Sequence, residues 1–228
     1  MKFEIARPGN ANGISLQLEK KITETGEMKL SPEEKEHIIS TAAIKFGEFL
    51  EALGCDWKND PNSSDTPRRV AKSYVEDLWR GRYELLEKVT SFPSDNYTGI
   101  AFEGGIPVVS MCSHHHREII GFAHIAYVTT EEGKVVGLSK LNRIVEQFAR
   151  RGAIQEQLTV AIHNAVETMC TGNIGVAVMI EATHSCVSCR GVKHQGASMK
   201  TAKLSGCFLK EDSARAEFYK FTESYRLK

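Results

Sequence analysis

The chain has 228 residues, of which 41% are hydrophobic and 25% are charged. This length fits one domain, or one domain with a helical extension, and the composition is typical of a globular protein with a buried core. Lys and Arg together number 29, as do Asp and Glu, so no overall basic charge exists to hold nucleic acid or a membrane surface. We therefore expect neither as a partner, and an anionic ligand must be bound by a local cluster of cations.

The N-terminus and the cysteines indicate the compartment. The first residues carry two basic side chains but no apolar segment, so we expect no signal peptide, and no apolar run approaches the roughly 20 residues that span a bilayer. We therefore expect a cytoplasmic protein. In a reducing compartment its six cysteines are free thiols or metal ligands rather than disulfides.

The N-terminal part of the chain predicts an arm followed by helices. Residues 1–30 are polar and lack periodicity, so we interpret them as a mobile arm. Ser31-Pro32-Glu33-Glu34 predicts a capped helix start, and apolar residues at helical spacing continue to Gly54. Thr66-Pro67 opens a second predicted helix. Together these helices form a predicted helical region, residues 31–98.

From about residue 100 the pattern changes to segments rich in β-branched and aromatic residues, which are typical of strands. The predicted elements are strands at 106–111, 122–129 and 135–136, helices at 139–151 and 154–169, strands at 174–183 and 203–209, and a helix from 212 or 213. This order predicts an α+β domain over residues 99–228, with helices packed on one face of an antiparallel sheet.

Two windows rich in cysteine and histidine follow predicted strands. They are Cys112-Ser113-His114-His115-His116 and His184-Ser185-Cys186-Val187-Ser188-Cys189-Arg190. Thiolate and imidazole are the ligands that zinc prefers, and a catalytic site uses three protein ligands and leaves the fourth position to water. A solvated His-rich loop explains the first window alone, but it does not explain two such windows. The pair favours a mononuclear catalytic zinc site.

The Cys186 and Cys189 spacing also allows two other interpretations. A structural Cys₄ site needs a second cysteine pair, whereas Cys55, Cys170 and Cys207 stand singly. A redox pair typically opens a helix in a thioredoxin-like fold, whereas this one leaves a predicted strand. Both alternatives are weaker than a catalytic zinc.

Five ordered stretches, spread from Ser31 to the C-terminus, resemble the GTP cyclohydrolase I family. They are Thr66–Lys72, Cys112–His115, Gly137–Val145, Ile154–Thr159 and His184–Gly191. The resemblance implies the tunnelling fold (T-fold) and a toroidal homodecamer, in which small antiparallel sheets join edge to edge so that few edges stay exposed. Phosphate-binding and guanine-binding groups then come from adjacent subunits.

The resemblance also implies the catalytic residues. Zinc is bound by Cys112, His115 and Cys186, and Cys189 lies outside the coordination sphere. His114 and His184 are acid–base groups, because the ordinary pKa of histidine suits proton transfer near neutral pH. We interpret His116 as a bystander, and a hydrogen bond that supports the ligands is its best functional alternative.

The triphosphate needs several cations and main-chain donors, because its large charge is partly desolvated. Residues at the family's phosphate-binding positions are Arg69, Lys72, Ser139, Lys140, Arg143 and Arg190. Each basic residue alone is also explained as a solvated surface charge, and Ser139 also fits as the N-cap of its helix.

Gln155 and Glu156 are expected to recognise guanine. A carboxylate accepts hydrogen bonds from the N1–H and the exocyclic amine together, a pairing that adenine cannot offer. Glu156 is also explained as an acidic residue in the first turn of a helix, where the helix dipole favours it.

The reaction that the resemblance implies is hydrolysis of GTP to 7,8-dihydroneopterin triphosphate and formate, a first step of tetrahydrofolate, pterin or deazapurine biosynthesis. Zinc-bound water attacks C8, and His184 and His114 move protons as the imidazole ring opens. A second hydrolysis releases formate, the ribose carbons rearrange, and a six-membered ring closes.

One residue departs from the family pattern, because Ser113 stands where the family usually has Glu. The missing carboxylate removes a charge that raises histidine basicity or orients water. A lower rate, a reaction that stops at an intermediate, and another purine substrate all stay open. A catalytically silent nucleotide-binding homologue is a further alternative, which the intact zinc ligands and histidines argue against.

Overall fold

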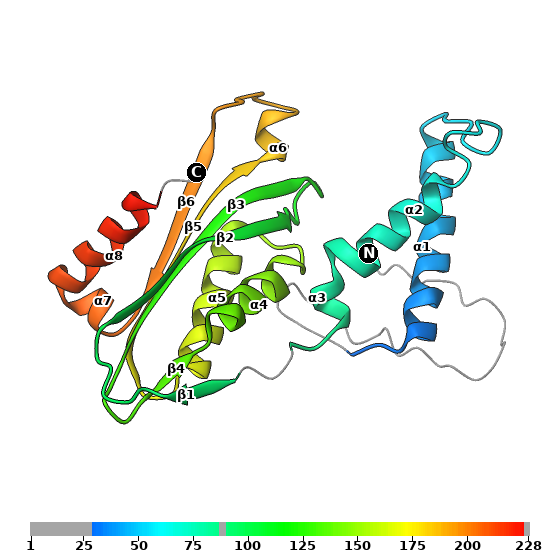
Figure 1. Ribbon diagram of the computed structural model, residues 1–228. Coiled ribbons are helices and arrows are strands. Elements are labelled where there is room, and N and C mark those ends of the chain that lie inside the picture. Colours follow the sequence, from blue (N-terminus) through cyan, green and yellow to red (C-terminus); the bar gives the residue numbers. More distant parts are fainter. Residues whose placement is uncertain (1–28, 87–89, 226–228) are drawn as a thin grey trace, which may run out of the picture.

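The structure is a computed structural model that describes residues 29–86 and 90–225, so almost all of the proposed N-terminal arm, residues 1–30, lies outside it (Figure 1). A four-stranded antiparallel sheet has the strand order β2-β3-β5-β6. Its strands are β2 (Ile100–Met111), β3 (Glu118–Thr129), β5 (Asn173–His184) and β6 (Ser198–Leu204). In the described part of the chain, no helix has the length and apolar character needed to span a membrane.

The N-terminal helices begin where the sequence predicts. Helix α1 (Pro32–Ala52) opens with a capping box. The Ser31 hydroxyl accepts from the Glu34 N–H at 3.2 Å, and the Glu34 carboxylate accepts from the Ser31 N–H at 2.7 Å. The second predicted helix is confirmed but interrupted, because α2 (Thr66–Ser73) runs into a π-helical turn, η1 (Tyr74–Leu78), before α3 (Arg80–Tyr83).

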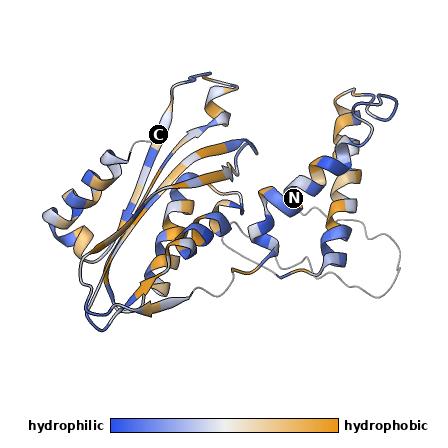
Figure 2. Cartoon of the chain, viewed as in Figure 1, coloured by the Kyte–Doolittle hydropathy of each residue, from blue (hydrophilic) through white to orange (hydrophobic). Residues whose placement is uncertain are grey.

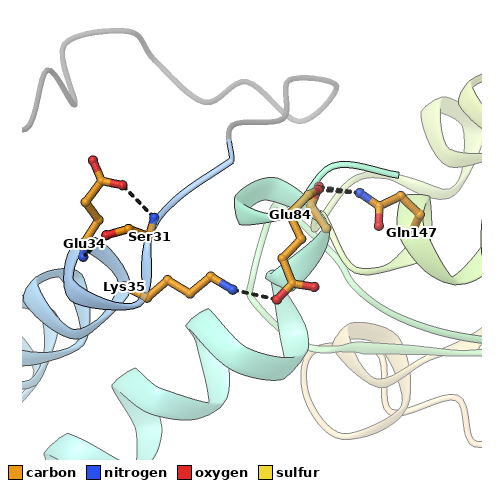
Figure 3. A network of polar contacts seen from close by, with 6 residues as sticks. Ser31, Glu34, Lys35, Glu84 and Gln147 are labelled. Atoms are coloured by element: carbon orange, nitrogen blue, oxygen red, sulfur yellow. Dashed lines mark hydrogen bonds and ion pairs between the residues drawn. The ribbon is translucent and has the colours of Figure 1, made fainter. Parts of the chain in front are cut away.

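Glu84, just after α3, joins the N-terminal helices to the sheet domain (Figure 3). Lys35 of α1 lies 2.6 Å from the Glu84 carboxylate, and the Gln147 side chain of α4 (Leu138–Ala149) donates to the Glu84 carbonyl at 2.7 Å. The connection from the N-terminal helices to the four-stranded sheet contains β1 (Ser91–Pro93), which pairs with β4 (Lys134–Val136) in a small two-stranded sheet. Residues 91–93 were not predicted as a strand, and the boundary near residue 98 stays a prediction.

Helices cover both faces of the four-stranded sheet, so the prediction that they pack on one face is wrong. Helices α4 and α5 (Gln155–Met169) cover one face, and α7 (Cys207–Lys210) and α8 (Asp212–Ser224) lie on the other (Figure 1). Along β5, Val178 is buried in the larger core with α4 and α5, whereas Ala177 and Met179 pack with Phe208 and Phe218. Both faces of this strand are therefore apolar, and Figure 2 shows hydrophobic residues (orange) along the central strands.

The last predicted strand, 203–209, is also partly wrong, because β6 ends at Leu204 and α7 follows. Gly206 has a φ of 55°, and a Cβ there would lie 1.9 Å from the Ile174 carbonyl oxygen. The chain turns at this glycine, so Cys207 and Phe208 are buried under α8 rather than in a strand. An apolar run of this length fits a strand or a short buried helix equally well.

Candidate active site

The register of the sheet brings the two cysteine and histidine windows to the same end. Met111, the last residue of β2, pairs with Glu118 at the start of β3, and Ile119 pairs with His184 at the end of β5. Because the windows lie at the ends of β2 and β5, they meet although they are far apart in the sequence.

A cysteine pair, Cys112 and Cys186, lies at the centre of this end of the sheet. Cys112 is 4% exposed, and its N–H donates to the Arg117 carbonyl at 2.8 Å, which closes the turn after β2. Cys186 lies in the short helix α6 (Ser185–Ser188), in hydrogen-bonding contact with Cys112. Burial and the neighbouring Cys112 raise the pKa of the Cys186 thiol, and the positive charge of Arg190 opposes this shift.

His114 and His115 are exposed on the turn that follows Cys112, with ring centroids 6.3 Å apart. Within residues 29–86 and 90–225, no three His, Cys, Asp or Glu side chains converge closely enough to hold a metal ion. The structure thus brings two of the three predicted ligands together, and the ring of His115 does not join them. Two adjacent thiols, followed by an imidazole in the same turn, are a donor set that fits zinc.

His184 is held by Gln155, the first residue of α5. The Gln155 amide nitrogen lies within 3.1 Å of three acceptors, the carbonyls of Ile180 and Met199 and the hydroxyl of Thr201. Its amide oxygen therefore faces His184 Nε2, at 2.7 Å. An amide oxygen only accepts, so Nε2 carries the proton and Nδ1 of the neutral ring has the free lone pair.

Glu156 lies beside this pair, exposed at the start of α5. Burial lowers the pKa of His184, and the negative charge of Glu156 opposes this shift. His184 is therefore mainly neutral near pH 7 and can act as a base. Gln155 is fully buried, and its side chain makes hydrogen bonds to His184 and to strands β5 and β6. Sequence analysis missed this positioning role. Its contact with guanine stays a prediction.

The predicted phosphate-binding residues are scattered. On α2, Arg69 pairs with Asp65 at 3.1 Å and Lys72 lies 3.6 Å from Glu76, and all four side chains are largely exposed. The N-cap of α4 is Gly137, so the prediction that Ser139 caps this helix is wrong. The helix begins at Leu138, one residue before Ser139, because Gly137 is the last residue with an extended backbone.

The start of α4 lies far from the cysteine pair within one chain. Asn142 donates to the carboxylate of Glu103, which lies on β2 opposite Ile125 of β3. Glu118, at the active-site end, is roughly 20 Å from Ile125 along β3. The α4 residues predicted to bind phosphate are Ser139, Lys140 and Arg143. Among the predicted phosphate-binding residues of the described structure, Arg190 is the one whose charge acts on the cysteine pair, at the Cys186 thiol.

Comparison with known proteins decides the family. The profile of the GTP cyclohydrolase I family matches residues 42–223. The chain belongs to this family. It is 45% identical over 179 residues to "GTP cyclohydrolase 1" of Pseudoalteromonas translucida, covering 76% of this chain and 92% of that protein. It is 43% identical over 193 residues to the Chlorobaculum tepidum protein of that name, covering 82% and 83%. The family is one of metal-dependent enzymes.

Proposed function

We propose that the chain is a zinc-dependent GTP cyclohydrolase I, which hydrolyses GTP to 7,8-dihydroneopterin triphosphate and formate. Membership of the family over residues 42–223 supports this activity, and the contact between Cys112 and Cys186 beside His184 carries the assignment of the site. Cys112, Cys186 and His115 would hold zinc, and Cys189 would remain outside. When bound there, zinc supplies a Lewis acid that activates water.

His184 is the proposed base of the ring-opening step. Its Nε2–H is committed to Gln155, so Nδ1 is the nitrogen that takes up and returns a proton while the imidazole ring of guanine opens. Gln155 fixes the tautomer and the ring orientation. His114, exposed on the turn after Cys112, is the proposed second acid–base group. After a second hydrolysis releases formate, the ribose carbons rearrange and a six-membered ring closes.

Glu156 is the proposed guanine-recognition residue. Its carboxylate is exposed at the start of α5 and lies within electrostatic reach of His184. There it can accept from the N1–H and the exocyclic amine together, which distinguishes guanine from adenine. Recognition and proton transfer would then take place on adjacent elements, α5 and the end of β5.

The binding site for the triphosphate is proposed to be shared between subunits of a T-fold homodecamer. The cations on α4 and the cysteine pair lie toward opposite ends of one sheet, so a neighbouring subunit supplies the phosphate end. The outer strands of the sheet, β2 and β6, offer edges for joining neighbouring sheets. Light scattering at working concentration should give a large oligomer, and a monomer would contradict the assembly.

Incubation with GTP tests the activity. Formate should be measured by an independent assay, in parallel with pterin fluorescence after oxidation. Equal molar amounts of formate and pterin are expected for the complete reaction. Formate without pterin would overturn it in favour of a truncated reaction, and unconsumed GTP would point to another substrate or a silent homologue.

Ser113 favours one alternative function, a related hydrolase that stops at a formamidopyrimidine or uses another purine nucleotide. A hydroxyl replaces the carboxylate that the family usually carries beside His114, which changes proton delivery at this position. For the complete reaction, we propose a cytoplasmic role at the first step of tetrahydrofolate, pterin or deazapurine biosynthesis.

A further inference from the structure

His116, which sequence analysis interprets as a bystander, is held in an unusual conformation next to the predicted ligand His115. Its φ is 50°, a left-handed conformation that few residues other than glycine adopt, and its N–H donates to the Cys112 carbonyl at 2.9 Å. Such a conformation persists only where the surroundings hold it in place. The turn that carries His114 and His115 is therefore fixed at its far end by His116.

Two aromatic residues of the N-terminal region contact the His116 ring. The Tyr74 hydroxyl lies 3.3 Å from His116 Nδ1, within hydrogen-bond distance, and the Trp79 ring packs edge-on with its centroid 5.3 Å away. Tyr74 and Trp79 also pack against each other edge to face, at 5.0 Å. Burial raises the pKa of Tyr74, so its hydroxyl keeps its proton and can donate.

The π-helical turn η1 brings these two aromatic residues together, because the backbone N–H of Trp79 donates to the Tyr74 carbonyl at 2.8 Å. Single π-turns of this kind are frequent at functional sites. The Arg82 guanidinium lies 4.3 Å from the centroid of the Trp79 ring and donates to the Gly152 carbonyl at 3.0 Å.

Gly152 completes this packing. It has a φ of 67°, and a Cβ there would lie 2.5 Å from Trp79 Nε1. The glycine therefore permits a close approach that any larger residue would block. Because Gly152 lies just before α5, Trp79 contacts both the histidine turn and the connection that leads into Gln155 and Glu156.

We propose that Tyr74, Trp79 and His116 form an aromatic clamp that positions the turn carrying His114 and His115 relative to the start of α5. These are positioning residues, and their role rests on the proposed function of the turn. Without the clamp the exposed turn samples more conformations, and the fraction that places both histidines correctly falls.

Backbone hydrogen exchange tests the clamp without zinc or substrate. Tyr74→Phe removes one hydroxyl and keeps the ring, and Tyr97→Phe is the matched control, since the Tyr97 hydroxyl donates to the Ile100 carbonyl at 2.8 Å, at the opposite end of β2 from the histidine turn. In Tyr74→Phe, exchange over residues 112–117 should rise about 5-fold, as expected for one lost hydrogen bond. The same exchange as in the control would contradict the clamp.

Kinetics of the same variants test its functional consequence. Tyr74→Phe should lower kcat on GTP roughly 10-fold, the effect typical of residues that orient metal ligands, while KM stays within about 2-fold. His116→Phe and the double variant complete a cycle in which the two effects should not add, because both remove one interaction. Additive effects would refute the clamp. A parent protein that does not consume GTP would refute the proposed function instead, and the exchange experiment would still decide the clamp.

Discussion

The two ends of the sheet differ in how completely a single chain builds them. At the active-site end, the register of β2, β3 and β5 brings Cys112, Cys186 and His184 together, and buried hydrogen bonds fix the histidine. At the other end, half-buried Lys140 and exposed Arg143 lie on α4, toward the opposite end of the sheet from the cysteine pair. The proposed proton-transfer groups therefore meet within one subunit, whereas the proposed triphosphate site would take the cations of α4 from a second one.

Loss of a proposed zinc ligand should give the largest effect at the proposed active-site end. In Cys186→Ser, we expect zinc content to fall from one per subunit to near zero and turnover to fall to background, because a thiolate ligand is lost. Metal analysis and GTP turnover measure this. Cys189→Ser is the matched control and should retain its zinc, and zinc at full occupancy in Cys186→Ser would overturn the ligand assignment.

Hybrid oligomers test whether the two ends belong to different subunits. His184→Ala should lose about 10²- to 10⁴-fold in kcat, since it removes an acid–base group. Arg143→Ala should lose roughly 10- to 100-fold in kcat/KM, since it removes a charge-assisted contact to phosphate. Coexpressed variants should form hybrids more active than either parent, because some sites combine an intact His184 with an intact Arg143. Hybrids no more active than the parents would indicate that each site comes from one chain.

Ser113→Glu should have a smaller effect, confined to the active-site end. A carboxylate beside His114 favours the protonated ring, so we expect turnover on GTP to rise about 3- to 10-fold with the same product. GTP consumption, formate and pterin fluorescence should be followed in both proteins. A changed product or substrate preference would instead mean that Ser113 marks a retuned reaction.

Glu103→Gln should have the smallest effect, and it concerns the end where α4 begins. Burial raises the pKa of Glu103, and the hydrogen bond from Asn142 opposes this shift. Ionisation of this carboxyl therefore disfavours the fold, so its favourable contribution is present below its ordinary pKa and is lost as the pH rises through the raised value. The glutamine cannot ionise but can still accept from Asn142.

We therefore expect Glu103→Gln to raise the melting temperature more at pH 8 than at pH 5. The gain in unfolding free energy should be about 1 kcal/mol at most, because the carboxyl is partly exposed. Thermal unfolding at both pH values measures it, and an equal change at the two would show that ionisation of Glu103 is not the cause.

The amino-acid sequence alone determined the local features, because their causes lie within a few residues. The capping box at Ser31 and Glu34 forms as predicted, and the helix and strand periodicities place the central elements. Family membership, predicted from five short motifs, is confirmed by the match over residues 42–223. The predictions that failed, such as the strand over 203–209 and the cap at Ser139, concern boundaries set by packing elsewhere.

Only the tertiary structure decided which distant residues meet. No spacing in the sequence shows that Gln155 holds His184 or that Tyr74 contacts His116, since these pairs depend on how α5 and η1 pack against the sheet end. The same holds for α8, whose apolar residues fit either face of a sheet until both faces of β5 are seen to be buried. Periodicity indicates which side of an element is apolar, but the partner that covers it is chosen by the packing of the whole chain.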